Sequence, residues 1–198
     1  LRADVWSQLI HRFGRVRILE LYGSTEGNVV LANLTGEKVG SVGRVPLGLA
    51  TIELVRYDVA VDRFERDEGG SLIPCDDDEP GMLLAKIRTN NPLTRFDGYT
   101  DRGATEGRIV RDAFMPGDQW FVTGDLLKRD EDGDFWFVDR VGDTFRWKGE
   151  NVSTEEVGKV IQRAACVGLT SVYGVQIDGH EGRAGVAAGQ LSNGHRFD

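Results

Sequence analysis

The chain has 198 residues and a formal net charge of -8 at pH 7, with 40% hydrophobic and 28% charged residues. This length and composition predict a globular fold of one domain and part of another, and they exclude a disordered chain. The acidic balance and the lack of a basic cluster argue against nucleic acid as a partner. No apolar run reaches the roughly 18 residues that a membrane-spanning helix needs, whereas peripheral membrane contact stays open.

The cysteines and histidines do not suggest a disulfide framework or a zinc centre. Cys75 and Cys166 stand far apart without CxxC spacing, and His11, His180 and His195 lack the spacing of metal ligands. A reducing, cytoplasmic setting therefore fits best. The chain begins without Met and within a helical pattern, so we expect a piece of a longer protein.

The first elements are a helix, a strand and a polar loop. Apolar residues at helical spacing predict a helix from Asp4 to Phe13, which Gly14 ends. Val16 to Leu21 is predicted to be a buried strand that leads into the loop Tyr22 to Gly27. A loop rich in glycine and hydroxyl groups after a strand is either a plain turn or a ligand site, and spacing alone leaves both open. It matches neither a P-loop nor a nucleophile elbow.

The middle of the chain is dominated by short strands and turns. Glycine, proline and aspartate separate the apolar runs, which indicates a small β-barrel or a distorted antiparallel sheet. The predicted strands are Val29 to Asn33, Thr51 to Tyr57, Asp62 to Glu65, Met82 to Ile87 and Trp120 to Leu127. We interpret the acidic run Asp76 to Glu79 as a solvated turn rather than a metal site.

A hairpin and a charged joint follow Asp125, which is a carboxylate in an otherwise apolar run. Asp132-Gly133 predicts a two-residue hairpin turn, after which Asp134 to Asp139 returns as a strand. The aspartates at 130, 132 and 134 belong to this turn, because the pattern lacks the glycine and glutamate positions of an EF-hand loop. The joint Asp139 to Asp143 is either a surface turn or an interdomain hinge that touches a ligand, and spacing does not separate the two.

The last part of the chain has a different texture, which places a domain boundary near the joint. Thr144 to Trp147 is predicted to be a strand, and Ser153 to Glu156 is a capping box that begins a helix. Two further strands are expected at Thr170 to Ile177 and at Arg183 to Leu191. One helix and about three strands would leave one face of a sheet uncovered.

Three motifs occur together in the chain. They are Tyr22-Gly23-Ser24-Thr25-Glu26, Thr123-Gly124-Asp125, and Asp139-Arg140 followed by Lys148-Gly149-Glu150-Asn151-Val152. Together they resemble the adenylate-forming superfamily of acyl-CoA synthetases, peptide synthetase adenylation domains and luciferases. The loop Arg95 to Tyr99 and the string from Phe145 to Thr154 resemble its fatty acid transport protein and very-long-chain acyl-CoA synthetase branch. The resemblance covers essentially the whole chain.

The resemblance implies an α+β fold and two domain parts. Residues 1–139 would end the large AMP-binding domain with a β-barrel-like subdomain. Residues 140–198 would be the hinge and the first part of a small α/β C-terminal domain. Gly142 departs from the Asp or Lys often found at the family's pivot, so it leaves open whether a side chain guides the movement of the small domain.

The resemblance also implies roles for single residues. These are Tyr22 for stacking on adenine, Gly23 and Ser24 for the nucleotide loop, Thr25 for the α-phosphate, Glu26 for Mg²⁺, Asp125 for both ribose hydroxyls, Arg140 for ribose and phosphate, and Lys148 and Gly149 for the pantetheine path of coenzyme A. Thr25 and Glu26 are the candidate catalytic residues. A carboxylate suits a cis-diol because it accepts two donors at once.

The implied activity is an ATP-dependent long- or very-long-chain fatty acid–CoA ligase with fatty acid, ATP and CoA as ligands. The family's phosphate loop and adenylation lysine would lie outside this chain, so we expect the isolated chain to be inactive. Two alternatives are another adenylating enzyme that loads a carrier protein, and a non-catalytic fatty acid uptake or binding protein. We expect a cytoplasmic location, with membrane association left open.

Overall fold

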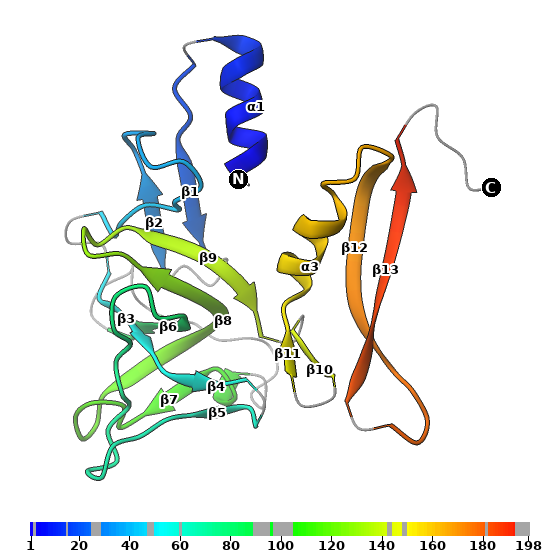
Figure 1. Cartoon of the computed structure of the whole chain (residues 1–198). Coiled ribbons are helices and arrows are strands. Elements are labelled where there is room, and N and C mark those ends of the chain that lie inside the picture. Colours follow the sequence, from blue (N-terminus) through cyan, green and yellow to red (C-terminus); the bar gives the residue numbers. More distant parts are fainter. Residues whose placement is uncertain are drawn as a thin grey trace. The chain divides into compact units, whose positions relative to one another are not determined.

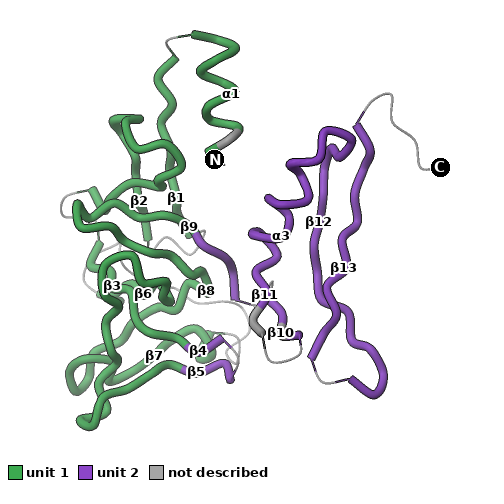
Figure 2. Tube along the Cα trace, in the orientation of Figure 1, with its two compact units in different colours: residues 1–57, 64–137 green, residues 58–63, 138–198 purple. Residues whose placement is uncertain are grey.

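The computed structural model has an α+β architecture, as predicted (Figure 1). The described residues are 1, 3–14, 16–24, 29–46, 50–59, 61–88, 96, 105–141, 144–147, 150–180 and 182–192. They form two compact units: unit 1 comprises Leu1–Tyr57 and Phe64–Phe137, and unit 2 comprises Asp58–Arg63 and Val138–Asp198 (Figure 2). The assignment of residues 1–139 and 140–198 to a large and a small adenylation domain stays a prediction.

Unit 1 begins with α1 (Ala3–Phe13), which confirms the predicted helix. On its apolar face the Trp6 side chain is fully buried, whereas the Phe13 side chain at the end of the helix is exposed. The helix ends at Gly14, whose φ of 76° allows its N–H to donate to the Ile10 carbonyl oxygen at 2.9 Å.

The predicted strand at Val16 to Leu21 is wrong in its position. The strand β1 (Glu20–Gly23) begins later and pairs antiparallel with β2 (Val30–Asn33), so the predicted strand at Val29 to Asn33 is confirmed. The ladder starts at the pair Glu20 and Asn33, because β2 ends at Asn33 and offers no partner further along. Val16 and Leu19 are accordingly exposed rather than buried.

The centre of unit 1 is an antiparallel sheet of five strands. Its strands are β3 (Ile52–Val55), β6 (Gly81–Lys86), β8 (Gln119–Arg129) and β7 (Ile109–Arg111), in that order, with β9 (Phe135–Arg140) paired to β8. The short strands β4 (Tyr57–Asp58) and β5 (Arg63–Phe64) form a separate pair. The register of β6 on β8 shifts, which fits the distorted-sheet form of the prediction.

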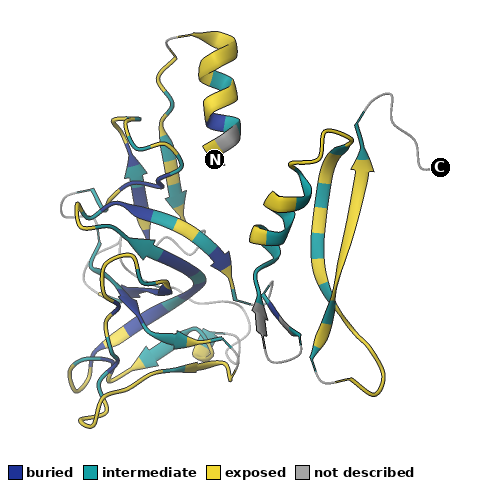
Figure 3. Cartoon of the chain, in the orientation of Figure 1, coloured by how far each residue is buried: buried dark blue, intermediate teal, exposed yellow. Residues whose placement is uncertain are grey.

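One hydrophobic core joins the first hairpin to this sheet. Leu31 of β2, Leu83 of β6 and Leu127 of β8 are fully buried in the same cluster, and buried positions recur along β8 (Figure 3). Gly43 bridges β2 and β9, because Ala32 pairs with Arg44 and Gly43 pairs with Phe135. A Cβ on Gly43 would lie 2.0 Å from the Ala32 carbonyl carbon, so only glycine lets the two backbones approach.

The hairpin between β8 and β9 is confirmed, but its turn is longer than predicted. Gly133 N–H donates to the Asp130 carbonyl oxygen at 2.9 Å, and Asp130 N–H donates to the Asp134 carbonyl oxygen at 3.0 Å. Gly133 has a φ of 84°, so the loop has three residues and ends with glycine in the left-handed region. The Asp130 carboxylate stabilises this loop by accepting from Asp134 N–H at 2.8 Å.

The described residues of unit 2 form two hairpins and one helix. They are β10 (Phe145–Trp147) with β11 (Glu150–Val152), α3 (Thr154–Ile161), and β12 (Val167–Gln176) with β13 (Arg183–Leu191). The predicted cap is confirmed, since the Ser153 hydroxyl accepts from Glu156 N–H at 3.2 Å. Sequence analysis missed β11. Among the described residues, no helix is both long and apolar enough to cross a bilayer.

Candidate functional site

Tyr22 and Asp125 meet in unit 1 although 103 residues separate them in the chain. Tyr22 lies near the end of β1 and packs against the hydrophobic core, and its hydroxyl donates to Asp125 Oδ2 at 2.6 Å. Both residues are half-buried, so the contact lies where the core reaches solvent. The structure thus brings together two residues of separate motifs, for which the family resemblance predicts base and ribose binding.

Asp125 reaches this position because Thr123-Gly124-Asp125 forms a β-bulge. Met82 pairs with Leu126 and Leu84 with Val122, so three residues of β8 lie opposite one residue of β6. A bulge of this kind bends the strand and redirects its side chains. In a regular strand, side chains alternate between the two faces of the sheet. The two extra residues of β8 interrupt this alternation next to Asp125.

Thr123 supplies the hydrogen bonds that the bulge removes from the ladder. Its buried hydroxyl donates to the Leu83 carbonyl oxygen at 2.9 Å and accepts from Asp125 N–H at 3.0 Å. The strand β6 therefore keeps a partner for its carbonyl, and the backbone of Asp125 is held in place. This role for Thr123 was not predicted.

Glycine at position 124 is favoured by its backbone conformation, and an added Cβ would also displace the end of the Arg108 side chain. Its φ is +83°, and a Cβ at this position would lie 2.5 Å from Arg108 Nη1. The same nitrogen donates to the Thr123 carbonyl oxygen at 3.2 Å, which satisfies another group at the bulge. A glycine inside an apolar strand pattern is the signal that could have predicted this bulge.

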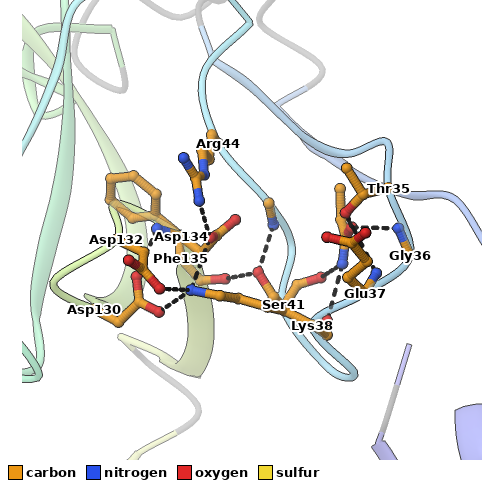
Figure 4. Close-up of polar contacts among 12 residues, drawn as sticks. Thr35, Gly36, Glu37, Lys38, Ser41, Arg44, Asp130, Asp132, Asp134 and Phe135 are labelled. Atoms are coloured by element: carbon orange, nitrogen blue, oxygen red, sulfur yellow. Dashed lines mark hydrogen bonds and ion pairs between the residues drawn. The ribbon is translucent and has the colours of Figure 1, made fainter.

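A clamp of opposite charges holds the segment after β2 against the β8–β9 hairpin (Figure 4). Lys38 Nζ contacts the carboxylates of Asp130, Asp132 at 2.8 Å and Asp134 at 3.0 Å. Arg44 Nη2 lies 2.7 Å from Asp134 Oδ2. Ion pairs with these neighbours surround the three aspartates, which supports the reading of a hairpin turn rather than a calcium loop.

The pKa shifts of the clamp follow from these contacts. Hydrogen bonds to the carboxylates, that of Asp130 first, raise the pKa of Lys38. The hydrogen bond from Arg44 is the main cause that lowers the pKa of Asp134. Lys38 and Asp134 are therefore charged at neutral pH. Among the described residues, no group of histidine, cysteine, aspartate or glutamate side chains could hold a metal ion.

The loop that follows β1 is described only at its start. Ser24 N–H donates to the Val29 carbonyl oxygen at 3.3 Å, and a Cβ on Gly23 would lie 3.2 Å from that oxygen. The Ser24 hydroxyl is shielded from solvent and has no hydrogen-bond partner among the described residues. Thr25 and Glu26 lie outside those residues.

The described residues of the joint after β9 are linked by hydrogen bonds to Asp139. Asp139, which is buried, accepts from Arg140 N–H at 2.8 Å and from the Thr144 hydroxyl at 3.1 Å. Gly142 lies outside the described residues, as do the predicted coenzyme A contacts Lys148 and Gly149. The grouping of Arg140 with Asp125 in one site stays a prediction.

Comparisons with known proteins agree with the motifs. Human long-chain fatty acid transport protein 3 is 43% identical over 201 residues, and mouse long-chain fatty acid transport protein 5 is 46% identical over 202 residues; each match covers 100% of this chain. The chain spans only 29% of the length of either relative. No protein-family model matches the chain.

Solved structures share its fold. ATP-bound MatB from Rhodopseudomonas palustris has a TM-score of 0.75 at 24% identity and covers 100% of this chain, which spans 35% of that protein. O-succinylbenzoate coenzyme A synthetase from Bacillus subtilis, in complex with AMP, has a TM-score of 0.66 at 25% identity and covers 98% of this chain, again over 35% of its own length. The predicted resemblance is therefore confirmed: along its full length the chain matches a segment of the long-chain fatty acid transport proteins, with the fold of adenylate-forming enzymes.

Proposed function

We propose that this chain is part of an ATP-dependent long- or very-long-chain fatty acid–CoA ligase. The single observation that carries the proposal is the contact between Tyr22 and Asp125, because it places the candidate adenine and ribose residues side by side. Arg140 is expected to reach the ribose and phosphate from the joint. Lys148 and Gly149 are expected to line the path of the pantetheine arm.

The side chains gathered at this site in unit 1 suit a nucleotide. Tyr22 offers an aromatic ring beside a carboxylate, which suits an adenosine because bases stack on rings and a cis-diol donates twice to a carboxylate. The Ser24 hydroxyl, without a partner among the described residues, is a donor suited to a phosphate oxygen. Glu26 is the proposed ligand of Mg²⁺, which would neutralise charge on the phosphates.

The proposed reaction has two steps. An oxygen of the fatty acid carboxylate attacks the α-phosphorus of ATP, the bond to the β-phosphate oxygen breaks, and pyrophosphate leaves. The thiol of coenzyme A then attacks the acyl carbon, the thioester forms, the thiol proton is lost, and AMP leaves. Hydroxyl donors of Ser24 and Thr25 would stabilise the negative charge that builds on the phosphoryl oxygens in the first step.

The proposal is tested by pyrophosphate release from the full-length protein that contains this chain. We expect release with ATP and fatty acids of graded length, and acyl-CoA formation when coenzyme A is added. Transfer to a carrier protein instead of coenzyme A would favour another adenylating enzyme. Fatty acid binding without pyrophosphate release would favour the uptake protein that the relatives' names suggest, and the isolated chain should release none.

The magnesium assignment has its own test. Glu26→Gln removes the charge while it keeps the side-chain shape, so the full-length variant should need more Mg²⁺ for half-maximal pyrophosphate release. Glu37→Gln, at an exposed glutamate of the next loop, is the matched control. An unchanged magnesium titration in Glu26→Gln would remove Glu26 from the site.

A further inference from the structure

We propose that Phe145 is a positioning residue for the thioester-forming step. It acts through the β10–β11 hairpin, because the sequence places Lys148 and Gly149, the expected contacts of the pantetheine arm, between these two strands. This inference rests on the proposed function. It adds a residue that does not itself touch the substrate but sets the position of the segment that does.

The β10–β11 hairpin is too short to fix its own position. Its strands pair with each other in a two-stranded sheet, from Phe145 opposite Val152 to Trp147 opposite Glu150. A two-stranded hairpin by itself is at best marginally stable in water. The path of the chain on either side of residues 148 and 149 therefore depends on what β10 contacts elsewhere in unit 2.

Phe145 lies in a socket that Gly174 and Gly185 form on the β12–β13 hairpin. The two glycines pair directly across these strands, and the Phe145 side chain is buried. A Cβ on Gly185 would lie 2.9 Å from Phe145 Cζ and 3.3 Å from its Cε2, whereas Gly174 lies beside the Cβ of Phe145. Neither glycine could therefore gain a side chain unless Phe145 moved.

Trp147 attaches the other end of β10 to the same hairpin. Residues two apart in a strand share a face, so Phe145 and Trp147 turn to the same side of β10. The Trp147 ring stacks on the ring of His180, with centroids 5.9 Å apart and an angle of 21° between the planes. The backbone of Trp147 also forms a bridge to Gly182, just before β13. The strand β10 is thus held at its first and its last residue.

These contacts should affect the two half-reactions differently. Catalysis by positioning tolerates little displacement, since a shift of about 1 Å can slow a reaction on the order of a hundredfold. The residues expected to bind adenine and ribose, Tyr22 and Asp125, belong to unit 1, whereas Phe145 and its socket belong to unit 2. Displacement of β10 should therefore slow acyl transfer to coenzyme A more than formation of the acyl adenylate. A residue that only stabilises unit 2 would not separate the two steps.

The experiment measures each half-reaction on the full-length protein. A single turnover of pyrophosphate release, with ATP and fatty acid but without coenzyme A, reports formation of the acyl adenylate. Acyl-CoA formation from supplied acyl adenylate and coenzyme A reports the second step. Gly185→Ala pushes the Phe145 ring out of its socket, so the second step should slow about tenfold or more while pyrophosphate release stays within about twofold.

A second substitution should restore the lost step. Phe145→Leu removes the ring atoms that the new methyl group would meet, so the double variant should recover most of the acyl transfer that Gly185→Ala loses. Val172→Ala is the matched control, because Val172 lies on β12 and faces α3, where a Cβ on Gly158 would lie 3.8 Å from its Cγ2. It weakens packing within unit 2 but leaves the socket and Phe145 unchanged, so the ratio of the two half-reactions should stay that of the wild type.

Each outcome decides a separate point. Slower acyl transfer with intact pyrophosphate release in Gly185→Ala, recovered in the double variant, supports the proposal. Unchanged acyl transfer in Gly185→Ala, or the same selective loss in Val172→Ala, overturns it and leaves the ligase assignment standing. A wild type that releases no pyrophosphate, or passes no acyl group to coenzyme A, refutes the proposed function and this inference with it.

Unfolding curves of each variant show whether unit 2 keeps its fold. If Gly185→Ala does not fold, then Phe145→Leu alone decides, because the smaller side chain leaves the socket partly empty and loosens β10. Selectively slower acyl transfer in that variant supports the proposal, and an unchanged ratio of the two half-reactions overturns it.

Discussion

Gly174 and Gly185 face each other across β12 and β13, and the ring of Phe145 lies over both. A Cβ on Gly174 would lie 2.6 Å from Phe145 Cβ, and a Cβ on Gly185 would lie 2.9 Å from Phe145 Cζ. The pair of glycines therefore makes the space that buries Phe145, and this contact attaches the β10–β11 hairpin to the β12–β13 hairpin within unit 2.

Gly174→Ala should destabilise unit 2. The added methyl group overlaps the Phe145 side chain, and overpacking of this kind costs about 1–3 kcal/mol of unfolding free energy. Gly158→Ala is the matched control, because Gly158 lies inside α3 and the added methyl group would only touch the Val172 side chain, at 3.8 Å. This substitution should raise the free energy of unfolding by about 0.5–1 kcal/mol, since alanine favours a helix more than glycine does. Chemical denaturation measures both, and equal effects of the two substitutions would contradict the role assigned to the glycine pair.

Thr123→Val should weaken both stability and nucleotide binding. The substitution keeps the shape of the side chain, but it leaves the Leu83 carbonyl and the Asp125 N–H without their hydrogen bonds. Loss of such buried partners costs about 1–3 kcal/mol. Thr123→Ser keeps the hydroxyl and should retain most AMP affinity. Calorimetry with AMP and denaturation test the pair, and equal AMP affinity of Val and Ser variants would argue against a positioning role.

Asp125→Ala should lose ATP affinity in the full-length protein. Hydrogen bonds to a charged group are worth about 1.5–3 kcal/mol, so the dissociation constant for ATP should rise by about one to two orders of magnitude. Asp132→Ala serves as the control, because it removes a carboxylate that Lys38 contacts in the turn between β8 and β9. If ATP affinity stays unchanged in Asp125→Ala, then Asp125 does not belong to the nucleotide site.

Asp118 should make stability depend on pH in the acid range. Burial tends to raise the pKa of its carboxyl, but hydrogen bonds from Trp120, Ala113, Phe114 and Met115 outweigh this, so the pKa is lowered from 3.8. Because the pKa of Asp118 is lower in the folded state, its carboxylate contributes fully to the free energy of unfolding above pH 3.8. This contribution is lost as the pH falls through the pKa of Asp118 in the folded protein.

Asp118→Asn tests this dependence. At pH 7 the variant should be less stable than the wild type by about 1–3 kcal/mol, because an amide cannot accept from all four donors. The difference should shrink as pH falls below the ordinary value of 3.8. Asp77→Asn, whose carboxylate is exposed and lies 3.9 Å from Arg129, should follow the wild type at every pH. A constant gap between Asp118→Asn and wild type down to strongly acid pH would refute the assignment.

Local patterns in the sequence determined a large part of the fold. The helical spacing before Gly14, the apolar runs of β6 and β8, and the cap at Ser153 each depend on neighbours in the chain, so their signals are complete within a few residues. The three motifs and their order likewise identified the family resemblance and the candidate residues. The hairpin after β8 was predictable for the same reason.

Only the tertiary structure decided how these parts meet. The strand β1 begins at Glu20 because its ladder ends opposite the last residue of β2, and the Asp130 side chain adds a hydrogen bond across the three-residue turn that follows it. The bulge around Gly124 depends on a carbonyl of β6, which is 40 residues away from Thr123 in the chain. The contact of Tyr22 with Asp125 needs the whole core between β2 and β8, and no local pattern encodes a distance between residues so far apart.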